Sequence, residues 1–432
     1  MPRPRQSAPA APADRPVSAA EAQALFTTFE SRRHIALAVS GGGDSTALMW
    51  LAARWAKSLK SPPKIDVLTV DHGFRATSGD EARQVGAWAK ALGLKAHILR
   101  STSPKPVSGL QQKARRLRYR LMADWCGKAG AEVLVTAHTQ EDQAETLLMR
   151  LARGSGVIGL GAMAAEGVIE GGLPIARPFL GISRSRLRAT LGAAGHPWIE
   201  DPSNENTQFE RVRMRKMMPK LAEIGLTSEA LARSAKRLGR AAKPLLRSSE
   251  ALFAAAIDMR PQGYALVDLE KFQGAEAEIR ILTLQQLLKI LGGSNDLAQL
   301  SEVERLEDWI ITGAGQARTL AGCRIARRSK VLVAGREPGR IASEPIILPS
   351  SGGVVWDGRF RVEWGNRPNG SVIVPAARVP GLDRIKELPA FVQAGLPAIM
   401  ASGRAVGLPY TTEPPDGLVC RFLGADAFSA LP

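Results

Sequence analysis

A short stretch near the amino end of the chain carries residue types suited to binding a polyphosphate. It reads IALAVSGGGDSTAL, from Ile35 to Leu48, and its three glycines follow an apolar run of strand length. Because glycine has no Cβ, its backbone N–H groups can approach an anion closely, and a helix that starts at this point adds the positive end of its dipole. Asp44 would repel a phosphate unless a divalent cation lay between them. The stretch therefore predicts a strand, an anion-binding loop and a helix start, with an Mg²⁺-bound polyphosphate as ligand.

The predicted phosphate-binding residues are Ser40, Gly41, Gly42, Gly43, Asp44 and Ser45, and Asp44 is also the predicted metal ligand. The other common phosphate loop, G-x-x-x-x-G-K-[ST], requires a lysine that this stretch lacks. The alternative without chemistry is a glycine-rich turn in which Asp44 caps the helix.

A second group of polar residues follows an apolar run at Glu132 to Thr136. His138 and Asp142 are four residues apart, and Asp142 and Glu145 are three apart, so a helix would place all three on one face. This face is acidic and carries one imidazole. It could hold Mg²⁺ or an ammonium group, or position a nucleophile. The alternative is that Thr139 and Asp142 only cap the helix.

Two basic segments suggest a polyanionic partner. The predicted helix Gly109 to Lys128 carries Arg115 and Arg118, which share a face and suit a phosphate clamp, although a solvated basic helix is the alternative. Residues 211 to 247 hold eleven Lys and Arg against two acids, a concentration that an RNA backbone explains better than solubility does. The residues proposed for this contact are Arg211, Arg215, Lys236, Arg237 and Arg240.

The elements needed to position these residues alternate along the chain. Apolar runs at residues 35–39, 65–70, 96–99 and 132–136 read as buried strands separated by helical patterns, which predicts an α/β fold with a parallel, Rossmann-like sheet. Ligands bind outside the carboxyl ends of such strands, so Asp71 and His72 should lie near the Ser40 loop, with His72 as a further nucleotide contact. His72 as a surface loop residue is equally compatible with the sequence.

The rest of the chain divides by composition. We expect a disordered tail over 1–22, a catalytic domain over 23–218, a helical basic domain over 219–320 and a β-rich module over 321–432. Gly154 to Gly159 matches G-x-G-x-x-G, but it follows a helix rather than a strand, so we interpret it as a loop.

The composition argues against several classes of protein and site. The net charge of +17, from 58 Lys and Arg against 41 Asp and Glu, favours a folded RNA partner, and the low aromatic content of 5% disfavours single-strand stacking. No apolar run approaches the roughly 20 residues needed to span a membrane. The three cysteines are far apart, which fits a reducing cytoplasm, and the five scattered histidines give no zinc pattern. The oligomeric state stays open, with a homodimer as one alternative.

Seven motifs stand in the order and rough spacing of one family. They are SGGGDS (40–45), VDHGFR (70–75), KARRLRY (113–119), TAHTQEDQAET (136–146), RPFL (177–180), WIEDPSN (198–204) and RVRMR (211–215). SGGGDS after an apolar strand resembles the loop of the ATP pyrophosphatase superfamily. Together the motifs resemble bacterial tRNA(Ile)-lysidine synthetase over about residues 33 to 220, and more weakly beyond.

The resemblance implies an activity. Such enzymes join L-lysine to C2 of the wobble cytidine in a CAU-anticodon isoleucine tRNA, using ATP and releasing AMP and pyrophosphate. The Ser40 loop would hold the β and γ phosphates with Mg²⁺ on Asp44, and Arg115 and Arg118 would lie near the α-phosphate. His138, Asp142 and Glu145 would surround the lysine.

Two positions depart from the family pattern. Glu141 stands where an aspartate is usual, which leaves a metal role there open, and Val212 replaces an amide side chain. One rival interpretation is a tRNA-thiolating relative, which the isolated cysteines disfavour. The other is a nucleotide-gated RNA-binding protein without turnover, which Asp44 and the acidic face disfavour.

Overall fold

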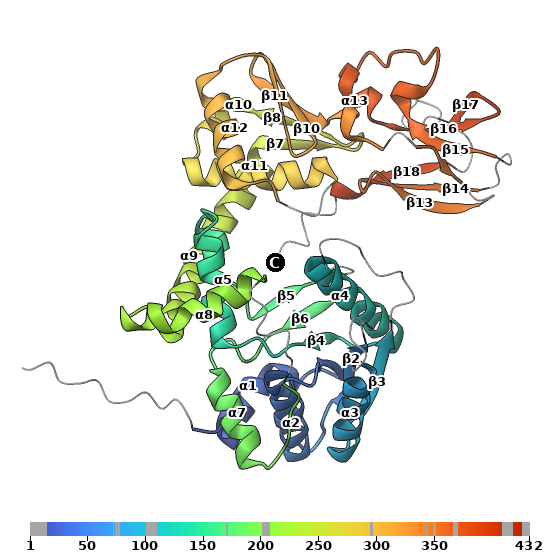
Figure 1. The fold of residues 1–432 in the computed structure, drawn as a ribbon. Coiled ribbons are helices and arrows are strands. Elements are labelled where there is room, and N and C mark those ends of the chain that lie inside the picture. The colour runs from blue at the N-terminus through green and yellow to red at the C-terminus, as the bar shows by residue number, and fades with distance from the viewer. Residues whose placement is uncertain are drawn as a thin grey trace, which may run out of the picture. The chain divides into compact units, whose positions relative to one another are not determined.

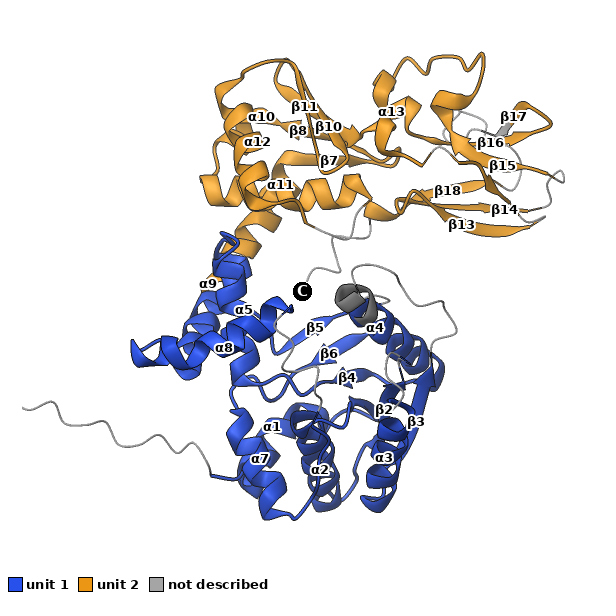
Figure 2. Cartoon of the chain, viewed as in Figure 1, with its two compact units in different colours: residues 1–240, 432 blue, residues 241–431 orange. Residues whose placement is uncertain are grey.

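The computed structural model describes residues 15–71, 73, 78–100, 110–169, 172–200, 208–293, 297–342, 344–348, 351–365, 370–407 and 418–425. The chain divides into two compact units, one ending at Arg240 and the other starting at Ala241 (Figure 2). His72 and the Asp201-Pro202-Ser203-Asn204 part of one motif lie outside the described residues.

The first unit alternates strands with helices (Figure 1). Its strands are β1 (His34–Ala38), β2 (Lys64–Asp71), β3 (Lys95–Arg100), β4 (Val133–Val135), β5 (Glu166–Val168) and β6 (Pro174–Ala176). Its helices are α1 (Ala19–Phe26), η1 (Thr27–Phe29), α2 (Gly43–Ser58), α3 (Ser78–Ala91), α4 (Leu110–Ala129), α5 (Gln140–Leu151), α6 (Val157–Leu160), α7 (Arg184–Ala193), α8 (Glu210–Glu223) and the first part of α9 (Ser228–Ala256). The predicted parallel α/β fold is confirmed.

The order of the strands explains where a ligand can bind. The sheet runs β3-β2-β1-β4-β6-β5, and all neighbouring pairs are parallel except β5 with β6. The chain moves outward from β1 through β2 to β3 and then returns to β4 on the other side of β1. Loops that leave β1 and β4 at their carboxyl ends therefore diverge, and the crevice between them is the usual ligand site of such sheets. The Ser40 loop and the His138 segment are these two loops.

Alternation along β1 builds both faces of this sheet. Ile35 and Leu37 are fully buried against α1, α2, α3 and α7, whereas Ala36 faces the cluster that α4 covers with Met122 and Cys126. Successive side chains of a strand point to opposite faces, so an apolar run covered on both faces needs no polar residue. This double burial anchors the strand that ends at the glycine loop.

A disordered tail was predicted over residues 1–22, and its last eight residues are ordered in the structure. Residues 15–22 are described, and α1 starts at Ala19 behind a Ser18 and Glu21 capping box. Val17 and Ala22 are buried in the core, and the Val17 N–H donates to the Thr190 hydroxyl at 2.9 Å. The prediction of disorder through residue 22 was wrong because apolar contacts and a helix cap outweigh the Pro- and Ala-rich composition before them.

The second unit is mixed. Its helices are the remainder of α9, α10 (Leu269–Gln273), α11 (Ala277–Gly292), α12 (Leu300–Thr312), η3 (Pro338–Arg340), η4 (Ala376–Arg378), α13 (Ala390–Ala394) and η5 (Leu423–Ala425). Its strands are β7 (Ile257–Arg260), β8 (Tyr264–Asp268), β9 (Ala317–Leu320), β10 (Cys323–Arg328), β11 (Val331–Arg336), β12 (Ile346–Ile347), β13 (Gly352–Trp356), β14 (Phe360–Trp364), β15 (Val372–Pro375), β16 (Pro397–Ala401), β17 (Arg404–Gly407) and β18 (Val419–Phe422).

Three antiparallel sheets share one core in this unit. Their orders are β7-β8-β11-β10-β9, β12-β15-β16-β17 and β13-β14-β18, which confirms a β-rich carboxyl part. The hairpin β7–β8 was not predicted, because it lies within the region expected to be helical. Its residues pair with β11, so a partner about 65 residues later in the chain stabilises a strand that local pattern alone did not reveal. None of the described helices is long and apolar enough to cross a membrane.

Candidate active site

The glycine loop joins β1 to α2 as predicted. Gly41 has a φ of +92°, and its carbonyl accepts hydrogen bonds from the Thr46 hydroxyl at 2.9 Å and the Ile199 N–H at 2.9 Å. A Cβ at this position would lie 2.7 Å from the Ile199 Cδ1 atom, so both the backbone conformation and the space require glycine.

The start of α2 is left available for an anion. Gly42 is the N-cap and makes no side-chain cap bond, which leaves Gly43, Asp44 and Ser45 in the first turn. The Ser45 hydroxyl accepts from the Ser40 N–H at 3.1 Å and donates to the Gly42 carbonyl at 3.0 Å, which closes the loop into a compact ring. The helix N-terminus and this loop form the kind of site that binds phosphate groups.

The acidic face lies at the start of α5. Thr139 is its N-cap, and Thr139 and Asp142 form a reciprocal capping box in which the Thr139 N–H donates to Asp142 Oδ2 at 2.8 Å. The capping role considered for Asp142 is therefore real, but it uses one carboxylate oxygen and leaves Oδ1 for another partner. Glu145, one turn further, is fully buried.

One guanidinium joins the acidic face to the glycine loop. Arg184, the first residue of α7, donates from Nε to Asp44 Oδ2 at 3.3 Å and from Nη1 to Glu145 Oε1 at 3.1 Å, and it also contacts Asp142 Oδ1 through Nη2. Three carboxylates from α2 and α5 therefore converge on a single side chain. The phosphate loop and the acidic face therefore lie no further apart than the span of the Arg184 guanidinium and its hydrogen bonds.

Two further arginines, both proposed above for tRNA contact, bind the same carboxylates. Arg211 donates from Nε to Glu145 Oε2 at 2.7 Å and from Nη2 to Asp142 Oδ1 at 3.0 Å. Arg215 donates from Nε to Glu145 Oε1 at 2.9 Å. Three guanidinium groups thus neutralise Asp44, Asp142 and Glu145 in the protein alone, and a role for Arg211 and Arg215 on RNA stays a prediction.

The pKa values of the three acids are shifted in opposite directions. Burial raises the pKa of Asp44 to about 6, with Asp142 and Glu141 adding to the rise and Arg184 opposing it. Burial also acts to raise the pKa of Asp142 and Glu145, but the surrounding arginines outweigh it and hold both below their usual values. Asp142 and Glu145 are therefore anions near pH 7, whereas Asp44 still titrates just below neutrality.

His138 is a neutral imidazole. Burial lowers its pKa to about 3, Asp142 opposes that shift, and the charges of Arg115, Arg177 and Arg211 reinforce it. Its Nδ1 atom lies 2.9 Å from the Thr136 hydroxyl, which fixes the ring beside the end of β4. A neutral ring next to ionised carboxylates can accept a hydrogen bond from an ammonium group.

The other predicted contacts lie on exposed helices. Arg115 and Arg118 are exposed on α4, and Lys236, Arg237 and Arg240 are exposed on one face of α9, opposite Leu231 and Ala235. Within the described part of the chain, no carboxylate forms a salt bridge with Lys236, Arg237 or Arg240, which suits them to an external polyanion.

The two departures from the family pattern have structural explanations. The Glu141 carboxylate accepts the Arg184 backbone N–H at 3.1 and 3.0 Å, so it ties the start of α5 to the start of α7 and holds Arg184 in place. Val212 is buried in α8, where an apolar side chain packs without a hydrogen-bond partner.

Sequence reasoning missed Arg184, although a signal was available. Ser183 is the N-cap of α7, which places a cation in the first helical turn, where the helix dipole disfavours it. Such a residue requires acidic partners from elsewhere, and here α2 and α5 supply them.

The residues fit a magnesium ion bound jointly with phosphate. Among the described residues, no three His, Cys, Asp or Glu side chains form a ready metal cage. Mg²⁺ usually takes one or two carboxylates and completes its shell with water and substrate phosphates, so Asp44 beside the glycine loop is a suitable donor set.

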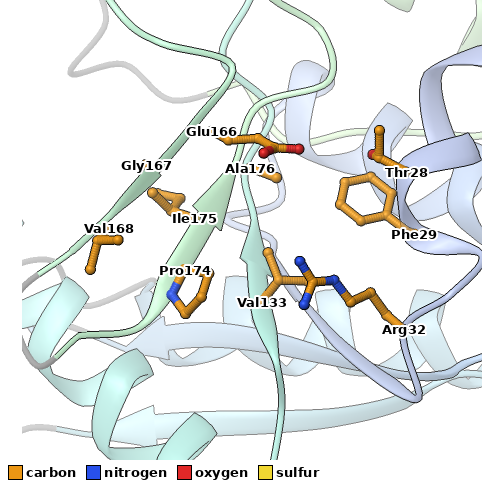
Figure 3. Close-up of a pocket in the computed structure, with 10 residues that line it drawn as sticks. All are labelled: Thr28, Phe29, Arg32, Val133, Glu166, Gly167, Val168, Pro174, Ile175 and Ala176. Atoms are coloured by element: carbon orange, nitrogen blue, oxygen red, sulfur yellow. The ribbon is translucent and has the colours of Figure 1, made fainter. Parts of the chain in front are cut away.

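A separate hollow of about 290 Å³ lies between β5, β6 and the Thr28 to Arg32 segment (Figure 3). Its lining is mainly apolar, with Arg32 and Glu166 as the charged side chains. None of its lining residues belongs to the predicted site.

The class of protein follows from the order of the strands, the glycine loop and the helix that starts after it. These features define an ATP-binding PP-loop α/β domain. The family model described as "PP-loop domain" matches residues 15–221. The chain is 42% identical to the tRNA(Ile)-lysidine synthase of Rhodopseudomonas palustris over 336 residues, covering 77% of this chain and 95% of that protein.

Two further relatives extend the match. The tRNA(Ile)-lysidine synthase of Bradyrhizobium diazoefficiens is 44% identical over 67% of this chain and 82% of its own length. That of Ruegeria pomeroyi is 36% identical over 88% of this chain and 87% of its own length. The chain therefore belongs to the tRNA(Ile)-lysidine synthase family, and it is a PP-loop ligase of that type, as the motifs predicted.

Proposed function

We propose that the protein ligates L-lysine to C2 of the wobble cytidine of a CAU-anticodon tRNA(Ile), through an adenylated cytidine, with release of pyrophosphate and then AMP. The product lysidine would change the codon read from AUG to AUA. The carbonyl oxygen at C2 is a poor leaving group. When it attacks the α-phosphate of ATP, pyrophosphate leaves and the oxygen becomes adenylated, so the lysine ε-amine can then attack C2 and expel AMP.

One observation carries this proposal most directly. Arg184 contacts Asp44 in the phosphate loop and Glu145 in the acidic face at the same time. A nucleotide on the loop and an amine on the acidic face would therefore lie within one side chain's length of each other. This proximity is what transfer between an adenylated base and an amine requires.

The roles follow from charge. The Ser40 to Ser45 loop, with His72, binds the nucleotide, and its helix start faces the β and γ phosphates. Arg115 and Arg118 neutralise the α-phosphate region. Mg²⁺ held by Asp44 would screen the charge that develops on the phosphates.

The acidic face binds the second substrate. Asp142 and Glu145 attract the ammonium groups of lysine, and neutral His138 accepts a hydrogen bond from the ε-amine. Both kinds of group are acceptors for the proton that the amine must lose before it attacks. Lys236, Arg237 and Arg240, together with Arg211 and Arg215, are proposed to contact the tRNA. The three separated cysteines suit a cytoplasmic enzyme.

Incorporation of radiolabelled lysine into purified tRNA(Ile) tests the whole proposal. Label should appear with ATP and not without it, and methionine tRNA, which also carries a CAU anticodon, should stay unlabelled. AMP formation without incorporated lysine would retain the adenylation step and overturn the choice of nucleophile. Tight tRNA binding with no AMP would instead support a binding protein without turnover.

A further inference from the structure

The arginines around His138 fall into two sets. Arg211, like Arg184 and Arg215 beyond it, is bound to carboxylates of the acidic face. Arg115 and Arg177 also act on the charge state of His138, yet neither forms a salt bridge with a carboxylate in the described part of the chain. Of the three arginines that act on His138, one is therefore paired with carboxylates of the protein, and the other two have no carboxylate partner among the described residues.

Arg177 is held at the edge of the sheet where substrates bind. It directly follows β6, its backbone N–H donates to the Ala165 carbonyl at 2.7 Å, and its Nη1 donates to the Ala164 carbonyl at 2.8 Å. Its Nε atom is buried and has no hydrogen-bond partner. A buried, unsatisfied donor on a charged group is costly, and an anion is the partner that would remove that cost.

The neighbouring strand brings His138 to the same edge. Thr136, at the end of β4, donates its backbone N–H to the Ala176 carbonyl at 2.9 Å, and its hydroxyl bonds the His138 ring at 2.9 Å. Arg177 and His138 thus extend from adjacent parallel strands at their carboxyl ends.

Arg115 adds a second cation from α4. Its Nη2 donates to the Tyr119 hydroxyl at 3.2 Å, and its guanidinium lies over the Tyr119 ring, 5.0 Å from the centroid. Burial lowers the pKa of Arg177, and the charge of Arg115 lowers it further against the effect of Tyr119, so the two cations lie near enough to repel each other.

We propose that Arg177 and Arg115 form an anion subsite beside His138 that binds a phosphate group of a substrate. The inference deepens the proposed function, on which the identity of the phosphate rests: it is either the α-phosphate of ATP or the phosphodiester next to the modified cytidine. Arg177 is the new member of this subsite. Its planar fork can give Nε and Nη2 to one phosphate while Nη1 stays on the Ala164 carbonyl.

The experiment compares Arg177→Gln with Arg150→Gln as a matched control. Arg150 is also a half-buried arginine of this unit, but both of its bonds from Nη1, to the carbonyls of Gly159 at 2.7 Å and Ala162 at 2.8 Å, are internal. Affinities for pyrophosphate, for a non-hydrolysable ATP analogue and for tRNA(Ile) are measured on the full chain, with thermal unfolding as a check of folding.

The expected result is a loss of about 10- to 100-fold in affinity for one phosphate ligand with Arg177→Gln, and no such loss with Arg150→Gln. Weaker binding of the ATP analogue alone identifies the α-phosphate. Weaker binding of tRNA alone identifies the phosphodiester. The slope of the logarithm of the tRNA affinity against the logarithm of salt concentration should then fall by about the amount expected for one phosphate contact. Arg177→Lys should recover part of the affinity, because the charge remains but the fork does not.

Unchanged affinities in Arg177→Gln, with only a lower melting temperature, would overturn the subsite. Should that variant not fold, Arg177→Lys, which keeps the charge and loses the planar fork, provides the test, and wild-type affinity of this variant for all three ligands would overturn the subsite equally. The subsite and the proposed function can fail separately. If the wild-type protein makes no lysidine but binds a phosphate ligand more tightly than Arg177→Gln does, the subsite is upheld and the proposed function is refuted.

Discussion

The Nε atom of Arg184 lies 3.3 Å from an oxygen of Asp44, although 140 residues separate them in sequence. This contact places the protein's own cation on the carboxylate proposed to bind Mg²⁺. Since Arg184 also binds Asp142 and Glu145, metal and lysine would each compete with it for oxygens.

Arg184→Gln should therefore lower stability without Mg²⁺ and increase the stabilisation that Mg²⁺ provides. In this variant only Arg211 and Arg215 remain to neutralise the carboxylates of Asp44, Asp142 and Glu145. A bound divalent ion would then compensate the negative charge that Arg184 neutralises in the wild type. The measurement is the melting temperature at a series of Mg²⁺ concentrations. An Mg²⁺-induced shift equal to or smaller than that of the wild type would show that Arg184 does not compete with the metal.

Asp44→Asn should abolish AMP formation and leave tRNA binding intact. The neutral side chain cannot hold Mg²⁺ against the phosphates, whereas the exposed cations on α9 are unaffected. Filter binding of tRNA and chromatography of AMP from the same preparation check both halves. Wild-type turnover by this variant would refute the metal assignment.

The same variant should be more stable than the wild type above about pH 6. The pKa of Asp44 is raised to about 6 in the folded chain, so its ionisation there opposes folding. The neutral carboxyl group of Asp44 contributes its full stabilisation below pH 3.8, the ordinary pKa of an aspartate. This contribution to the free energy of unfolding is lost as the pH rises through about 6. Denaturant unfolding at pH 8 should show a gain of roughly 1–3 kcal/mol for Asp44→Asn, and near pH 4 almost none.

Glu145→Gln should destabilise the protein and prevent lysine binding. Glu145 is fully buried and bound by Arg184, Arg211 and Arg215, so its loss leaves excess positive charge in the interior, at a cost of about 3–5 kcal/mol near pH 7. Because its folded pKa is lowered, this cost should shrink as pH falls below about 4.5.

The control is Glu229→Gln, whose carboxylate pairs with Arg233 on the exposed face of α9. Removing an exposed pair should change the free energy of unfolding by less than about 1 kcal/mol. Equal effects of the two substitutions would contradict the assignment of Glu145 to a buried ion cluster.

Gly161→Ala should destabilise the contact between α6 and α9. A Cβ on Gly161 would lie 3.0 Å from the Cα atom of Gly239, backbone against backbone, and a cost of about 1–3 kcal/mol is expected. Gly239→Ala should be tolerated, since its Cβ would have 3.7 Å to the nearest atom. Gly86→Ala, on α3 with open space around it, should be neutral or stabilising in the same unfolding assay.

The local parts of the site could be predicted from sequence because they depend on local chemistry. A glycine loop after an apolar strand needs no distant partner, and the spacing of Asp142 and Glu145 puts both on one face of α5. His138 was predicted on the same helical face, but it precedes the Thr139 N-cap and reaches the acids from the loop after β4. The parallel α/β fold followed from alternating patterns, and the motif order indicated the family.

What only the tertiary structure decided is how charges from separate elements combine. Arg184 and Glu141 became meaningful once α5 and α7 met at their starts, and Arg211 could be seen on Glu145 only after α8 was placed. The hairpin β7–β8 likewise depends on pairing with β11. Ion pairs and strand partners join residues far apart in the chain, and their energies depend on distance and burial in space, which residue types and sequence spacing do not specify.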